Sequence, residues 1–419
     1  MIPIPVQCPD WVNADPVATA FRTLFARLDW SGLPQRDPES PGPHPHPTAA
    51  YLKALLVKGA KQLRSIPALR LYLLEHPALA WELGFHRGHC PDQPAAFPVD
   101  HLVPQERWLR HWQHVAAPLL QQLLCASAQT VATLVPDLDT MTALDATHHL
   151  AWVKHNNQNQ SVPHRFVRTQ HPTGDPDCRL GAKTRHPRSG QRTNEAFWGY
   201  HSAVVATDTP GGAVVLGATV QPVVAQEVQL VHALIPQVET SLGHPPAGLT
   251  ADAAFDAGWV WNWPVAAGGV AAIAHNPRGG TPVRSPDGHP LCAQGHPMRP
   301  TTQTQAGPWP VQHYGCPLVG HAGATCPDPR FPRRGCHKRL SLSPGAQARR
   351  TIDRTSPTYR SAYRKRTGVE RICSQIKAWG LATPCGRSLA TVRSIVLVGY
   401  LLINLSTLRR LHALPNPNV

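Results

Sequence analysis

The sequence predicts a mixed α/β protein that is preceded by a helical domain and carries an inserted, irregular or β-rich subdomain. Apolar residues recur at helical spacing through much of residues 49–134. From residue 141 onward, runs rich in β-forming residues alternate with helical segments. Residues 278–357 are rich in Pro, Gly, Arg, His and Cys and show no helical period, which predicts the inserted subdomain.

Charge points to a polyanionic partner. The 419 residues are enough for two or three domains, and the formal net charge is +15. Residues 333–410 hold 17 Lys and Arg against two acids, Asp353 and Glu370, a difference of +15 that equals the net charge of the whole chain. Repulsion within one such segment favours binding to nucleic acid or to an anionic membrane surface, and disfavours a purely structural basic protein.

Features of export and membrane insertion are absent from the sequence pattern. The first residues lack a basic region followed by an apolar one, and the longest apolar run, 395–405, is shorter than the roughly 20 residues of a membrane span. The ten cysteines show no paired spacing. We therefore expect a cytoplasmic protein with reduced thiols and no membrane association.

The N-terminal third is predicted to be helical. Residues 1–47 form an N-terminal segment with a short helix at 17–28 and end as a Pro-rich linker. Residues 48–137 form a compact helical domain, with Ser65 as the N-cap of one helix and a long helical stretch over 104–134. Several short helices suit a helix-turn-helix-like reader of DNA, and they suit a dimerisation domain equally well.

Residues 138–277 predict the first part of the α/β core. We expect strands at 141–154, 197–207, 211–223 and 269–277, a basic polar connection at 164–193, a helix at 226–242, and a short strand that ends at Asp252. Asp145 lies inside the first strand, where a carboxylate is costly unless it is paired, binds a cation or faces solvent.

Parallel pairing of the first and fourth predicted strands would bring Asp145 and Asp252 side by side. This is the layout of an RNase H-like fold, in which two carboxylates share a pair of divalent cations. Asp256, expected in the first turn of the following helix, is the competing candidate. We prefer Asp252 because it ends the strand.

Residues 358–412 are predicted to complete the core with two helices. In the first, Tyr363, Arg366, Glu370 and Lys377 are spaced by three, four and seven residues, so one continuous helix would present all four on one face. A carboxylate among cations suits a site that holds a metal ion beside a phosphate backbone. The second helix, 389–411, is apolar on most faces and is expected in the core.

These residues resemble bacterial insertion-sequence transposases of the DDE type, in the branch marked by Tyr-x2-Arg-x3-Glu-x6-Lys. The stretches LDATHH and TADAAFDA are similar to the blocks of that family, and the likeness covers residues 49–411. The resemblance implies an RNase H-like catalytic domain with Asp145, Asp252 and Glu370 as catalytic and metal-binding triad. Its expected DNA-binding residues are Tyr363, Arg364, Lys365, Arg366, Arg371 and Lys377. His148 and His149 depart from the family pattern.

The resemblance also implies a function. The protein would bind the terminal inverted repeats of its own element, cut the ends by metal-dependent hydrolysis and join the freed 3′-OH to target DNA. Two Mg²⁺ ions are the expected cofactor, with Mn²⁺ able to substitute, and double-stranded DNA is the partner of a synaptic homodimer in the nucleoid. The alternatives are a nuclease without strand transfer and a catalytically inactive, transposase-derived DNA-binding protein.

Cysteines of the inserted subdomain are a separate candidate site. Together with His296, they could ligate a structural zinc ion in a segment that lacks another core. None of them forms a C-x2-C pair, so scattered thiols are the simpler interpretation. The four candidate ligands are Cys292, Cys316, Cys326 and Cys336.

Overall fold

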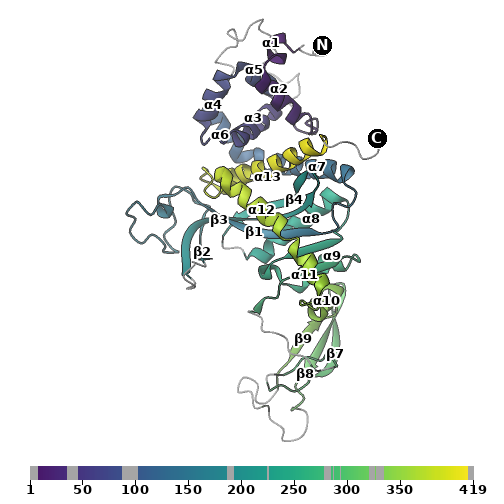
Figure 1. The fold of residues 1–419 in the computed structure, drawn as a ribbon. Helices are drawn as coiled ribbons and strands as arrows, with labels where there is room; N and C mark the ends of the chain where they lie inside the picture. Colours follow the sequence, from purple (N-terminus) through teal and green to yellow (C-terminus); the bar gives the residue numbers. More distant parts are fainter. Residues whose placement is uncertain are drawn as a thin grey trace. The chain divides into compact units, whose positions relative to one another are not determined.

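The computed structural model describes residues 8–34, 46–86, 102–185, 193–223, 226–277, 285, 287–292, 294–319, 326 and 335–413 (Figure 1). The core of the predicted Pro-rich linker, residues 35–45, lies outside these ranges. The chain forms two compact units. The first comprises Met1–Leu138, Asp145–His244 and Thr367–Val419, and the second comprises Asp139–Leu144 and Pro245–Arg366.

A mixed sheet follows the hydrogen-bonded order β2-β3-β1-β5-β6, with β4 also paired to β3. β3 is antiparallel to both β2 and β4, and its last ten residues form a hairpin with β4. Both strands of the hairpin are buried along most of their length, so they read as apolar runs. The strands of the first unit are β1 (Thr142–Leu150, whose first three residues belong to the second unit), β2 (Arg179–Arg185), β3 (Thr193–Thr209) and β4 (Gly212–Pro222).

Helix α13 (Leu389–Leu411) is the core helix of the first unit, where it packs on β4 and on α7 (Ala116–Leu134). It is long and apolar enough to cross a membrane, but 72% of its most apolar window is buried within the protein. Its one buried amide is satisfied: Asn404 donates to Ser127 Oγ at 2.9 Å and to the Val215 carbonyl at 2.8 Å, and accepts from the Val215 N–H at 2.7 Å. This amide ties α13 to a helix and a strand, as the predicted core role requires.

The N-terminal residues of the first unit are helical, as predicted. Ser65 accepts a hydrogen bond from the Ala68 N–H at 3.1 Å and caps α4. The long helix expected over 104–134 is divided at Val115, whose backbone leaves the helical region. The helices are α1 (Asp10–Asn13), α2 (Pro16–Phe25), α3 (Thr48–Ala60), α4 (Ile66–Glu75), α5 (Pro77–Leu83), α6 (Gln105–His114) and α7.

The second unit contains the parallel strands β5 (Gly248–Ala251) and β6 (Val270–Ile273) with α9 (Gly258–Val265) between them. It also holds a separate antiparallel sheet, β7 (Arg299–Ala306), β8 (Trp309–Gly315) and β9 (Lys338–Ser341). This small sheet lies within residues 278–357, where the sequence predicted a β-rich or irregular segment. The unit ends with α10 (Pro344–Thr351) and α11 (Pro357–Arg364).

Three further elements differ from expectation. The segment predicted as a polar connection contains the strand β2. Its side chains are partly basic and do not show an apolar strand pattern, but pairing with β3 supplies its backbone hydrogen bonds. Helix α10 was not predicted; Ser343 caps it by accepting from the Ala346 N–H at 3.3 Å. The helix predicted over 226–242 starts as a 3-10 turn, Glu227–Leu230, and continues as α8 (Val231–Leu242) with Pro236 inside.

Candidate functional site

Two predicted acids directly follow paired residues of neighbouring strands. β1 and β5 are parallel, and their register sets Leu144 opposite Ala251. Asp145 is the next residue of β1, and Asp252 is the first residue after β5. Both are half-buried. The predicted parallel pairing of the two acid-bearing strands is therefore confirmed. In both strands, the residue after the last paired position is an aspartate.

Asp252 is held by the turn that it begins. Its Oδ1 accepts the Ala254 N–H at 2.9 Å and caps a single 3-10 turn, Ala253–Phe255. A short carboxylate directly after a strand suits this position, because it can reach the free N–H groups of the turn. The cap fixes the side chain while leaving the carboxylate partly exposed.

Asp256 has a different environment. Its buried carboxylate accepts two hydrogen bonds from Arg349, at 2.7 and 2.9 Å, one from Trp261 Nε1 and one from the Asn276 N–H, both at 2.9 Å. Burial alone would raise the pKa of Asp256, but these donors lower it below its usual value. Both oxygens are committed to holding α9 and α10 together, so Asp256 is a structural anchor of the second unit.

Glu370 is a half-buried residue of α12 (Thr367–Ile376) in the first unit. The apolar face of this helix is buried through Val369, Ile372 and Ile376, and it packs against β3. Arg371, the residue after Glu370 in α12, forms an ion pair with Asp208 of β3. This pair is largely exposed and contributes little stability, although it lies directly beside Glu370 in the sequence.

The continuous helix predicted over residues 363–377 is wrong. Tyr363 belongs to α11, Arg366 lies in the turn after it, Glu370 belongs to α12, and Lys377 opens a π-helical turn, Lys377–Leu381. Thr367 and Gly368 are poor helix formers at the break. The guanidinium of Arg366 lies 5.7 Å from the centre of the Tyr363 ring.

The remaining predicted DNA-binding residues face solvent. Arg364, Lys365, Arg371 and Lys377 are exposed, whereas Tyr363 and Arg366 are half-buried. The ring of Tyr363 stacks on Tyr359 with centres 5.8 Å apart. Exposed cations of this kind can contact phosphates and position a nucleic-acid backbone.

His149, whose role the sequence left open, is fully buried on β1. Its Nδ1 lies 2.6 Å from the Leu381 carbonyl, and its Nε2 lies 2.8 Å from Ser202 Oγ, which contacts the Tyr400 hydroxyl at 2.9 Å. Burial lowers the pKa of His149 to about 4, so it is neutral near pH 7. Burial is the main cause of the raised pKa of Tyr400, and the nearby charge of Asp145 raises this pKa further.

His148 is half-buried on the same strand. Its Nε2 lies 3.8 Å from a Glu227 carboxylate oxygen, and its ring centre is 6.4 Å from that of His201. Burial, followed by nearby Lys377 and Lys183, lowers its pKa. Both histidines that depart from the family pattern are therefore packed into the structure around Asp145.

No three His, Cys, Asp or Glu side chains of the described residues are gathered as ready ligands for one metal ion. The magnesium triad stays a prediction. The four candidate zinc ligands are buried as free thiols in one apolar cluster with Met298. Their clustering gives the small sheet a core, and a zinc ion within it likewise stays a prediction.

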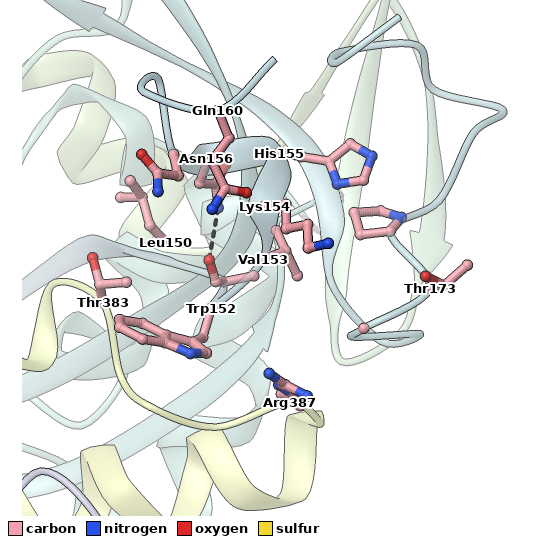
Figure 2. Close-up of a pocket in the computed structure, with 14 residues that line it drawn as sticks. Leu150, Trp152, Val153, Lys154, His155, Asn156, Gln160, Thr173, Thr383 and Arg387 are labelled. Atoms are coloured by element: carbon pink, nitrogen blue, oxygen red, sulfur yellow. Dashed lines mark hydrogen bonds between the residues drawn. The ribbon is translucent and has the colours of Figure 1, made fainter. Parts of the chain in front are cut away.

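A cavity of about 550 Å³ lies beside the C-terminal end of β1, entirely within the first unit (Figure 2). Trp152, Lys154 and Arg387 lie around it, and Trp152 is 51% exposed. Sequence analysis did not single out these residues. The sequence signal for this pocket would have been Trp152 and Lys154, an aromatic residue and a lysine just after the acid-bearing strand, where the core needs neither.

A scan against models of known protein families finds no match to this chain, and a search of curated proteins finds no matching relative.

Proposed function

We propose that the protein is a DNA transposase of the DDE type, with an RNase H-like catalytic domain. It binds the terminal inverted repeats of its own element, cuts the element ends and joins each 3′-OH to target DNA. It acts as a synaptic homodimer in the cytoplasm, at the nucleoid.

One observation carries the proposal. The parallel register of β1 and β5 leads each strand to an aspartate at the same step, Asp145 and Asp252. Adjacent parallel strand ends are where an open α/β sheet assembles a site. The environment of Asp256 supports Asp252 as the second acid, since Asp256 is consumed by Arg349 and Trp261.

Each part of the chain has a task in this reaction. Asp145, Asp252 and Glu370 would hold two Mg²⁺ ions, which supply water activation and stabilise the departing oxygen. Exposed Arg364, Lys365, Arg371 and Lys377 would bind phosphates and position the scissile bond. The buried, neutral His149 would keep β1 fixed beneath Asp145.

The bond changes balance without a covalent enzyme intermediate. In cleavage, the water oxygen bonds to phosphorus as the 3′ oxygen leaves and takes a proton. In strand transfer, the freed 3′-OH attacks a target phosphodiester, and one phosphodiester replaces another.

The test is Mg²⁺-dependent cleavage of duplexes that span the DNA flanking the gene. We expect Glu370→Gln to lose cleavage by at least about a hundredfold while it keeps DNA binding, because a neutral amide is a poor ligand for a divalent cation. Glu75→Gln, which changes an exposed glutamate of α4, is the matched control and should cut like the wild type.

Other outcomes select other functions. Equal cleavage by wild type and Glu370→Gln would remove Glu370 from the site. Binding without cleavage in either Mg²⁺ or Mn²⁺ would favour the inactive DNA-binding alternative. Cleavage without joined products in the presence of target DNA would favour the nuclease.

A further inference from the structure

Trp152 is a large aromatic residue that the protein leaves exposed instead of burying it in the core. It lines the cavity of about 550 Å³ and also a second one of about 380 Å³ in the same unit. No ring of the described residues stacks on its indole. Because Trp152 is 51% exposed and lines two cavities, its ring is available to a planar ligand.

The cavity wall is fixed although it has little regular structure. Asn156 donates to the Ala151 carbonyl at 2.8 Å and to the Trp198 carbonyl at 2.7 Å, and accepts from the Trp198 N–H at 2.9 Å. Arg165 holds the same loop by donating to the carbonyls of His155, Asn157 and Gln160. A loop held by so many bonds presents a preformed pocket.

The lining is cationic and offers an unused polar atom. Lys154 and Arg387 are exposed on it, and none of its lining residues is acidic. His155 also lines it, and its Nδ1 is buried without a hydrogen-bond partner among the described residues. A ligand in the cavity could supply the hydrogen-bond partner that this ring nitrogen lacks.

We propose that this pocket binds an unpaired nucleotide of the DNA strand, with its base stacked on Trp152, its base edge within reach of His155 and its phosphate between Lys154 and Arg387. An aromatic platform with flanking cations is the arrangement that binds single-stranded nucleic acid without sequence preference. The inference rests on the proposed function, because the strand is the one presented to Asp145. Leu150 at the pocket lies five positions after Asp145 on β1, about 16 Å along the strand.

The experiment compares two labelled DNAs with the full chain: a blunt duplex of the flanking sequence, and the same duplex with a short unpaired thymidine tail. Binding is measured by fluorescence anisotropy with Ca²⁺ in place of Mg²⁺. We expect the wild type to prefer the tailed DNA, and Trp152→Ala to weaken that binding roughly tenfold with the blunt duplex unaffected. Trp152→Phe should retain most of the preference.

Phe166→Ala is the matched control, since Phe166 is an exposed aromatic residue of the same unit that does not line the cavity. It should leave both affinities unchanged. Equal loss on both DNAs, or no loss with Trp152→Ala, would overturn the pocket while leaving the transposase proposal intact. Failure of the wild type to bind either DNA would overturn both.

Discussion

At the scale of single residues, two aspartates four positions apart have opposite roles. Asp252 caps one turn with a single hydrogen bond and keeps its carboxylate partly exposed. Asp256 is buried and accepts four hydrogen bonds. A functional acid needs lone pairs that the protein does not use, and only Asp252 of this pair has them to offer.

The two aspartates can be separated by matched substitutions. Asp256→Asn leaves Arg349 without its anionic partner, and breaking a buried pair of this kind costs about 3–5 kcal/mol, so the melting temperature should fall clearly. Asp252→Asn should leave the melting temperature within a few degrees but abolish Mg²⁺-dependent cleavage. Thermal melting and the cleavage assay measure the two effects. The reverse pattern would mean that the acids have been assigned to the wrong roles.

At the scale of elements, close helix packing positions Arg349. Gly345 is the second residue of α10, next to α9, and a Cβ at this position would lie 2.1 Å from the Asn262 backbone nitrogen. Because that neighbour is backbone, it cannot move aside as a side chain would. The glycine therefore permits the approach that lets α10 deliver Arg349 to Asp256.

We expect Gly345→Ala to destabilise the second unit by about 1–3 kcal/mol, the usual cost of overpacking, and to lower its melting temperature. Gly258→Ala is the control on the same pair of helices, since its added Cβ would meet Ala346 Cβ at an ordinary 3.4 Å. Differential scanning calorimetry distinguishes the two. Equal melting of both variants would show that the α9–α10 contact is looser than described.

At the scale of the whole molecule, buried histidines make the first unit sensitive to acid. Burial lowers the pKa of His111, His149 and His201 to about 4, against about 6.5 in the unfolded chain. Between these values the unfolded chain binds protons that the folded chain does not. Stability conferred by the neutral rings is therefore present above pH 6.5 and is lost as the pH falls toward 4.

The expected result is a melting temperature several degrees lower at pH 5 than at pH 7.5, at constant ionic strength. Circular dichroism melting at both pH values measures it. His148 has a lowered pKa as well and should contribute in the same direction. An unchanged melting temperature would mean that the three rings are not buried as neutral groups.

Local pattern was enough to predict much of the chain. Ser65 as a cap, the strand holding Asp145, the strand just before Asp252 and the core helix α13 all follow from periodicity and turn chemistry, which act between residues close in sequence. The parallel pairing of the two acid-bearing strands was also predicted, from the order of the strands and of the helix before the second acid.

Tertiary structure decided the rest, because it depends on partners distant in sequence. β2 is a strand because β3 lies beside it, and the helix carrying Tyr363 ends before the one carrying Glu370 begins. Only long-range contacts revealed that Arg349, 93 residues away, hydrogen-bonds to Asp256. They also revealed that a loop held by Asn156 and Arg165 forms a pocket at Trp152. A sequence specifies such bonds, but its local pattern does not display them.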